Sequence, residues 1–192
     1  LITDDNVAPL YSDTVKNSSI NQGYSVDMFV IPAGESSKSF DMAKDIYTKA
    51  IKLGLDRKSA IIALGGGVVG DLAGYIASTY LRGIPFVQVP TSLLAQVDSS
   101  VGGKVAINHE LGKNLIGSFY QPKKVIIDLK CLQTLPKREI ISGMAEIVKY
   151  GFIYDKDLFQ YLLDNSNSLM NIDLESMAKV VARSCEIKAD VV

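Results

Sequence analysis

Short apolar segments alternate with amphipathic segments through the first 130 or so residues of the chain. Two stretches, Ser39 to Gly54 and Asp71 to Gly83, carry apolar residues at helical spacing and end at a glycine. Apolar runs typical of buried strands surround them, at SVDMFVIP (Ser25 to Pro32), SAIIALGGG (Ser59 to Gly67), PFVQVPT (Pro85 to Thr91) and KKVIIDL (Lys123 to Leu129). Apolar strands alternating with helices predict an α/β fold with a parallel sheet covered on both faces.

The pattern changes after about residue 129. From Pro136 onward it is helical only, in PKREIISGMAEIVKYGFIY, DKDLFQYLLDN and DLESMAKVVARSCEIKADVV. We therefore predict an α/β domain over residues 1–132 and the beginning of an all-helical domain over residues 133–192. The last helical pattern has no Gly or Pro stop signal, and Leu1 to Thr3 resembles the end of a strand. We expect the chain to be part of a longer protein.

Composition excludes several classes of protein. The chain is 47% hydrophobic and 21% charged, with a net charge of -1 and no run of Lys or Arg, so nucleic acid is not an expected partner. No apolar run approaches the roughly 20 residues that span a bilayer, and no signal peptide pattern begins the chain. Cys131 and Cys185 are too few for a disulfide framework and too far apart for a metal knuckle. A reducing cytoplasm is the expected location.

A glycine-rich turn, ALGGGVVGD, follows one predicted strand and opens a helix. Gly65, Gly67 and Gly70 fit the pattern G-x-G-x-x-G, in which glycine lets the backbone approach a pyrophosphate at a helix N-terminus. A tight strand-to-helix turn without a ligand explains the same residues. The acidic residue that dinucleotide-binding folds carry about 20 positions later is missing from IPFVQVPT, whereas Asp71 directly follows the third glycine.

Two further groups of polar residues suit a ligand. In PAGESSK, Glu35 can bind ribose hydroxyls beside Lys38, although a charged surface turn fits equally well. After the strand ending at Pro90, a polar segment suits an anionic, hydroxyl-rich ligand, with a solvated loop as the alternative. Its side chains are Thr91, Ser92, Asp98, Lys104, Lys113 and Asn114.

The stretch SGMAEIVKYG places two charged residues in an apolar helical pattern. Glu146 and Lys149 are three positions apart, so one helical turn aligns them on one face. They form either an intrahelical ion pair or the ligands of partners outside the helix. His109, the sole histidine, lies between Asn108 and Glu110 in a predicted loop, and we expect it to face solvent rather than to bind a metal.

These motifs together resemble the 3-dehydroquinate synthase family. The resemblance is carried, in order from Leu1 to Gly151, by GGGVVGD, RGIPFVQVPTSLLAQVDSSVGGKVAIN, GKNLIGSFYQP and GMAEIVKYG. It implies a cytoplasmic, homodimeric lyase of the shikimate pathway, on the route to chorismate and the aromatic amino acids. The family converts 3-deoxy-D-arabino-heptulosonate 7-phosphate to 3-dehydroquinate and phosphate with catalytic NAD and a divalent metal, usually zinc, with cobalt as an alternative. Two other functions stay open: an NAD-dependent polyol or alcohol dehydrogenase of the same superfamily, and an isolated nucleotide-binding module.

The resemblance also implies roles for individual residues. Substrate contacts fall on Asp98, Lys104, Asn114 and Lys149, and Arg82 reaches the site of a neighbouring subunit. Glu146 matches a metal ligand, and the other two ligands, both histidines, have no counterpart here, so we expect weak NAD binding and no synthase activity from this chain alone. The implied NAD contacts are Asp4, Asn6, Ala33, Gly34, Glu35, Ser36, Ser37, Lys38, Gly65, Gly66, Gly67, Val68, Val69, Gly70, Asp71, Thr91, Ser92, Lys104, Lys113, Cys131, Leu132, Gln133 and Thr134.

Overall fold

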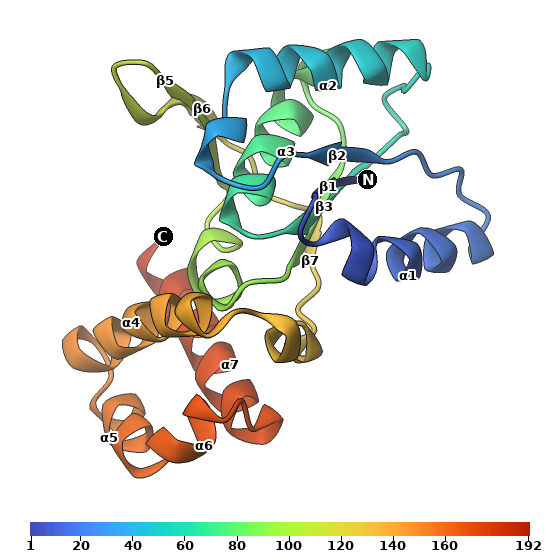
Figure 1. Ribbon diagram of the computed structural model, residues 1–192. Coiled ribbons are helices and arrows are strands. Elements are labelled where there is room, and N and C mark those ends of the chain that lie inside the picture. Colours follow the sequence, from blue (N-terminus) through green and yellow to red (C-terminus); the bar gives the residue numbers. More distant parts are fainter.

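The computed structural model describes residues 1–192 and confirms the α/β fold (Figure 1). Its sheet has five parallel strands in the order β2-β1-β3-β4-β7. The strands are β1 (Ile2–Asp4), β2 (Phe29–Ile31), β3 (Ile61–Gly65), β4 (Phe86–Pro90) and β7 (Lys124–Val125). The two outer strands, β2 and β7, are shorter than the apolar runs that predicted them.

Helices cover both faces of this sheet. The chain crosses from β1 to β2 through α1 (Ala8–Asn21), then returns past β1 to β3 through α2 (Phe40–Lys52), and reaches β4 through α3 (Gly67–Thr79). Because parallel crossovers are right-handed, the reversal of direction places α1 on one face and α2 and α3 on the other, as Figure 1 shows. The reversal point lies between β1 and β3, and a ligand crevice is expected at the carboxyl ends of these strands.

Two of the elements on the sheet differ from the sequence prediction. The helix predicted from Asp71 begins at Gly67, so the glycine turn forms its first residues. No apolar pattern indicated α1, and the structure gives the reason: Ser12 is the only residue of α1 that is buried.

The polar segment after β4, for which a solvated loop was the alternative to a ligand site, contains an antiparallel hairpin of β5 (Lys104–His109) and β6 (Gly112–Phe119). Val105 and Ile107 are buried against α3, whereas Lys104 and most of β6 are exposed. Gly74 allows this packing, because a Cβ there would lie 2.3 Å from Val105 Cγ1. The α3 helix therefore packs against both the sheet and the hairpin. This explains why α3 is apolar around most of its circumference.

The C-terminal part is helical, as predicted. It contains α4 (Lys137–Ile153), α5 (Lys156–Asp164), the short α6 (Ser166–Met170), which was not predicted, and α7 (Leu174–Val191). Its apolar cluster includes Ile147, Tyr150 and Val180, and it also includes Leu93 and Val97 from the segment after β4. The helices therefore pack directly against the segment that follows the carboxyl end of β4.

Four short helical segments connect these elements. They are the 3-10 segments η1 (Glu35–Ser37), η2 (Tyr80–Arg82) and η4 (Leu129–Thr134), and a π-helical turn, η3 (Ala95–Ser99). None of the helices is long and apolar enough to cross a membrane.

Candidate cofactor and substrate site

The glycine turn is shaped by close packing rather than by unusual dihedral angles. Gly65, Gly66, Gly67 and Gly70 all have negative φ. A Cβ on Gly66 would lie 3.3 Å from Ser92 Oγ, and one on Gly67 would lie 3.2 Å from Ser99 Oγ. No side chain caps α3 at Gly66, so the first-turn N–H groups are available to an anion at the positive end of the helix dipole.

The other predicted cofactor contacts line the same edge of the sheet. Asp4 ends β1, the segment Ala33–Lys38 follows β2, the glycine turn follows β3, and Thr91 and Ser92 follow β4. The carboxyl ends of parallel strands meet at one edge, which brings these four loops to the expected crevice. A dinucleotide is the kind of ligand that such an edge accommodates.

Some of these residues already have protein partners. Asp4 Oδ1 accepts hydrogen bonds from the N–H groups of Asn6 and Val7, both at 3.0 Å; burial raises the pKa of Asp4, and these two bonds oppose the shift. Cys131 and Leu132 are buried, whereas Gln133 and Thr134 are exposed. The Thr134 hydroxyl is hydrogen-bonded to that of Tyr11 on α1.

Lys38 joins two predicted sites. Its side chain is 4% exposed, and Nζ donates to Asp71 Oδ2 at 2.7 Å and to Asn114 Oδ1 at 2.5 Å. Burial raises the pKa of Asp71, and Lys38 opposes this shift. The Lys38 ammonium thus binds both Asp71, a predicted cofactor contact on α3, and Asn114, a predicted substrate contact on β6.

Asp98 joins the sheet edge to the helices. It lies in the π-helical turn η3, and its Oδ1 accepts a hydrogen bond from the Tyr150 hydroxyl at 3.1 Å and forms an ion pair with Lys188. Burial raises the pKa of Tyr150, and the carboxylates of Asp98 and Glu146 raise it further. Neither Tyr150 nor Lys188 was identified from the sequence, although Lys188 lies one helical turn after the buried Ser184.

Glu146 and Lys149 form an ion pair with each other on α4. The side chain of Glu146 is 17% exposed and that of Lys149 is 50% exposed. The intrahelical pair considered from the sequence is therefore present. Glu146 lies one helical turn before Tyr150, whose hydroxyl donates to Asp98.

Three further predicted site residues are exposed: Lys104 and Arg82, predicted substrate contacts, and Lys113, a predicted NAD contact. Lys104 and Lys113 are exposed on the hairpin, and Arg82 is exposed after α3 with a left-handed φ of 65°. None of the three is hydrogen-bonded to Asp98, Tyr150 or Lys188, or to Lys38.

Few side chains of the chain are placed to bind a metal. His109 is exposed on the hairpin, as expected, and its Nδ1 accepts a hydrogen bond from the Leu111 N–H at 3.2 Å. The 192 residues contain no group of three or more His, Cys, Asp or Glu arranged to hold a metal. Glu146 therefore fits a metal as one carboxylate ligand and not as a complete site.

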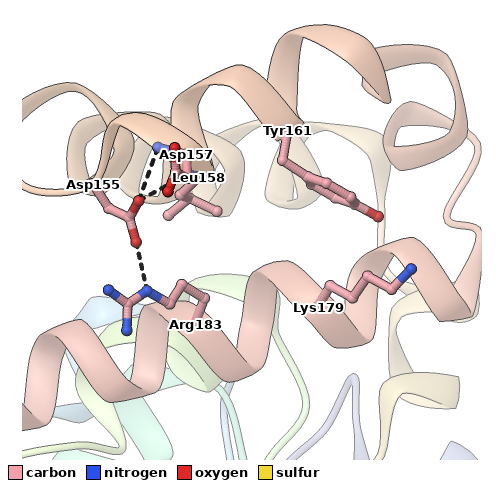
Figure 2. Close-up of a pocket in the computed structure, with 6 residues that line it drawn as sticks. All are labelled: Asp155, Asp157, Leu158, Tyr161, Lys179 and Arg183. Carbon is pink, nitrogen blue, oxygen red and sulfur yellow. Dashed lines mark hydrogen bonds and ion pairs between the residues drawn. The ribbon is translucent and has the colours of Figure 1, made fainter.

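Two cavities lie away from the predicted residues. One, of about 650 Å³, is mostly apolar and lies at the amino ends of β1, β2 and β3, opposite the glycine turn. The other, of about 380 Å³, lies between α5 and α7 (Figure 2). There Arg183 Nε donates to Asp155 Oδ2 at 2.5 Å, and the Leu158 N–H together with Arg183 lowers the pKa of Asp155. Lys179 lies over the Tyr161 ring, 5.9 Å from its centroid, so this cavity is lined by residues that stabilise the helical part.

Comparison with known proteins assigns the chain to two family models of one enzyme. Residues 28–142 match the family model of the 3-dehydroquinate synthase N-terminal domain, and residues 143–192 match that of the C-terminal domain. The chain belongs to the 3-dehydroquinate synthase family. The family resemblance drawn from the motifs is thereby confirmed.

Curated relatives match the whole chain. The 3-dehydroquinate synthases of Desulforamulus reducens and Geotalea uraniireducens are each 55% identical to it over 192 residues. The match covers 100% of this chain but 54% and 53% of those two relatives. The chain thus spans about half the length of the curated 3-dehydroquinate synthases that it matches.

Solved structures give the same architecture. The 2-epi-5-epi-valiolone synthase of Streptomyces hygroscopicus, with NAD+ and Zn2+ bound, is 28% identical with a TM-score of 0.92, over 98% of this chain and 53% of that one. A 2-deoxy-scyllo-inosose synthase complexed with carbaglucose-6-phosphate, NAD+ and Co2+ is 30% identical with a TM-score of 0.84, over the same shares. Glycerol dehydrogenase from Schizosaccharomyces pombe, at 19% identity and a TM-score of 0.68, shares the fold.

Proposed function

We propose that this chain supplies the cofactor-binding half and part of the substrate site of a 3-dehydroquinate synthase. The reaction is the conversion of 3-deoxy-D-arabino-heptulosonate 7-phosphate to 3-dehydroquinate and phosphate, a step of the shikimate pathway. The observation that carries the proposal is the contact of Asp98, after β4, with Tyr150 on α4, the helix that bears Glu146. Identity of 55% to curated synthases along the whole chain supports the assignment of the substrate.

The cofactor proposed for the sheet edge is NAD. The uncapped N-terminus of α3, with Ser92 and Ser99 packed closely against Gly66 and Gly67, suits its pyrophosphate. Two similar cyclases were solved with NAD+ bound, which supports the choice of dinucleotide. NAD would supply a reversible hydride acceptor, so that the reaction has no net oxidation.

The proposed metal ligand in this chain is Glu146. Its carboxylate is the right donor type for a divalent ion, and Zn2+ and Co2+ occur in the two similar cyclases. The metal would act as a Lewis acid on a substrate hydroxyl. Its further ligands would come from residues outside these 192.

The other polar residues bind and orient the substrate in this proposal. Lys149, half exposed beside Glu146, is available to an anionic group of the substrate. Asp98 can accept a hydrogen bond from a substrate hydroxyl, because its carboxylate is held in place by Tyr150 and Lys188. Holding these groups in fixed positions lowers the entropic part of the barrier.

We also infer the organisation of the whole enzyme. Residues 1–132 form the NAD-binding domain in this proposal, and residues 133–192 begin the metal and substrate domain. The apolar cluster of the second part also includes Leu93, Val97 and Leu132 from the first, so the two parts share a packed boundary. A homodimer in the cytoplasm is proposed, with Arg82 reaching the neighbouring site. The outward Arg82 and its neighbour Leu81 both have left-handed φ, 65° and 50°, a conformation that surrounding structure must hold at a cost of about 1–3 kcal/mol each.

A chimera tests this proposal. The chain would replace the matching 54% of the Desulforamulus reducens enzyme, with the unaltered enzyme as the control. Release of phosphate and formation of 3-dehydroquinate, without net accumulation of NADH, are expected. Net NADH from a simple polyol, or a folded, NAD-binding chimera that releases no phosphate, would contradict the proposed reaction.

The 192-residue chain gives a second test. We expect calorimetry to detect weak NAD binding by the chain and a phosphate assay to detect no synthase activity. A Gly67→Val variant should lose NAD binding, because the added side chain would occupy the turn beside Ser99. Phosphate release by the chain alone would disprove the expectation that residues beyond these 192 complete the metal site.

A further inference from the structure

The turn between α3 and β4 is strained and lies between two buried residues. Tyr80, before the turn, is 8% exposed, and Ile84, after it, is 1% exposed. The three residues between them have positive φ values of 50°, 65° and 115°, at Leu81, Arg82 and Gly83. A left-handed φ at a residue other than glycine persists only where the surrounding structure holds it, and such strain is common at ligand sites.

Tyr120, the residue directly after β6, holds the carboxyl side of this turn. Its ring packs against the apolar cluster of the sheet and α3, and its hydroxyl donates to the Ile84 carbonyl at 2.8 Å. A Cβ on Gly83 would lie 3.1 Å from the same hydroxyl, so the tyrosine also lies directly against the turn. A side chain from the hairpin therefore fixes the backbone where the strained residues end.

The turn places Arg82 at the surface. The Arg82 side chain is exposed, and it makes no hydrogen bond or ion pair within the chain. Arg57 holds the preceding residue, because its Nη2 donates to the Leu81 carbonyl at 3.2 Å. No contact of the Arg82 side chain within the chain accounts for the strained conformation. Its guanidinium keeps all five donors for an anionic group outside the chain, such as a phosphate or a carboxylate.

We propose that Tyr120 is a positioning residue for Arg82 and acts on the site of the neighbouring subunit rather than on its own. The inference rests on the proposed function, in which Arg82 reaches that neighbouring site. With the turn already held by Tyr120, less conformational entropy is lost when the guanidinium binds the substrate. An effect on its own site is the alternative, because the Tyr120 N–H donates to the Gly103 carbonyl at 2.7 Å, one residue before Lys104.

Hydrogen exchange of the chain tests the role of Tyr120 in the turn without any ligand. Tyr120→Phe removes only the hydroxyl, and we expect the amides of Gly83 and Ile84 to exchange about fivefold faster, the effect of one lost hydrogen bond. Tyr24→Phe is the control, since Tyr24 is 69% exposed and should leave these amides unchanged. Unchanged exchange at Gly83 and Ile84 in the Tyr120 variant would overturn the proposal.

Kinetics of the chimera described above measure the effect on the substrate. Tyr120→Phe should raise KM about fivefold with kcat little changed, because a less ordered Arg82 weakens substrate binding. Added to Arg82→Ala, it should have no further effect, because the tyrosine acts only through the arginine. Effects that multiply, or an Arg82→Ala variant with unchanged KM, would overturn the proposal. A folded chimera that binds NAD and releases no phosphate contradicts the proposed reaction instead, and hydrogen exchange still decides whether Tyr120 holds the turn.

Mixed dimers of the chimera, purified with two different affinity tags, identify the affected site. Glu146→Gln removes the proposed metal ligand, so only the other subunit of the mixed dimer has an active site. A Tyr120→Phe subunit paired with a Glu146→Gln subunit should show the unaltered KM, because its site receives Arg82 from a subunit with Tyr120 intact.

The reciprocal dimer places both changes in one subunit and pairs it with an unaltered one. Its single active site receives Arg82 from the subunit that carries Tyr120→Phe, so KM should rise about fivefold. The opposite pattern in the two dimers would show that Tyr120 acts on its own site and would overturn the proposal. A chimera that is active as a monomer would overturn it as well.

Discussion

The Tyr150 hydroxyl donates a hydrogen bond to Asp98 Oδ1 at 3.1 Å, joining two residues that lie 52 positions apart. Tyr150 is buried on α4, and Asp98 lies in the π-helical turn after β4. The same hydroxyl lies 3.4 Å from the Val97 carbonyl, and the Gln96 carbonyl accepts the Cys185 S–H at 3.2 Å. Side chains from the helices thus satisfy carbonyl groups of the π turn, a type of turn often found at functional sites.

The first prediction concerns this hydrogen bond. Tyr150→Phe should lower the free energy of unfolding by about 1 kcal/mol, because the buried Tyr150 ring remains packed while its hydrogen bond to the partly exposed Asp98 carboxylate is lost. Urea unfolding of the chain measures the change. Tyr24→Phe is the control, since Tyr24 is 69% exposed and should give no change. Equal stability of the Tyr150 variant and the unaltered chain would show that the bond adds nothing to the fold.

Two glycines of α3 give a matched pair. Gly74→Ala should destabilise the chain by about 1–3 kcal/mol, because the new Cβ would lie 2.3 Å from Val105 Cγ1 in a packed core. Gly70→Ala should be neutral or stabilising by up to about 1 kcal/mol, since the nearest atom to its Cβ would be 3.7 Å away and alanine favours the helix. Thermal unfolding compares the two, and the opposite order would contradict the packing of the hairpin against α3.

The contact of Asp155 with Arg183 predicts that the stability of the chain depends on pH. The Leu158 N–H and Arg183 lower the pKa of Asp155 in the folded chain. Its contribution to stability is therefore present above the unfolded pKa of about 4 and lost as the pH falls through the lower, folded pKa. Asn is an equally good helix cap, so Asp155→Asn removes the charge and keeps the cap of α5.

Urea midpoints of the unaltered chain and the Asp155→Asn variant measure this effect. The chain should be more stable than the variant at pH 5 to 7, and the difference should shrink toward pH 3. Because the other carboxyl groups are common to both proteins, their titration largely cancels in the difference. A difference that is independent of pH would exclude the charge of Asp155 as its source.

The two thiols should react slowly in the folded chain. Burial raises the pKa of Cys131 and of Cys185, with Asp128 and Glu186 adding to the respective shifts, and the thiolate is the reactive form. Labelling with a disulfide reagent at pH 8 should therefore be much slower than in urea, where both thiols are exposed. Single-cysteine variants identify which thiol reacts, and Cys131, which is 6% exposed, should be the slower. Fast labelling of Cys131 without urea would contradict its place in the core.

Local patterns in the sequence were enough to predict part of this structure. The apolar run at 59–67 and the helical spacing at 39–54 and 136–192 led to β3, α2 and the C-terminal helices, because burial of a repeated apolar face depends on neighbours a few positions away. The order of the motifs also identified the family. In contrast, α1 has one buried residue and β6 is mostly exposed. Neither element therefore has a periodic apolar pattern from which it could be predicted.

The sequence by itself determined the fold class, the family and the residue types at the site. Only the tertiary structure decided which side chains meet: Lys38 with Asp71 and Asn114, and Asp98 with Tyr150 and Lys188. These pairs are 33 to 90 positions apart. The physical reason is that such contacts depend on strand order and on the packing of the hairpin and helices around α3 and the π turn, which no local pattern of residues specifies.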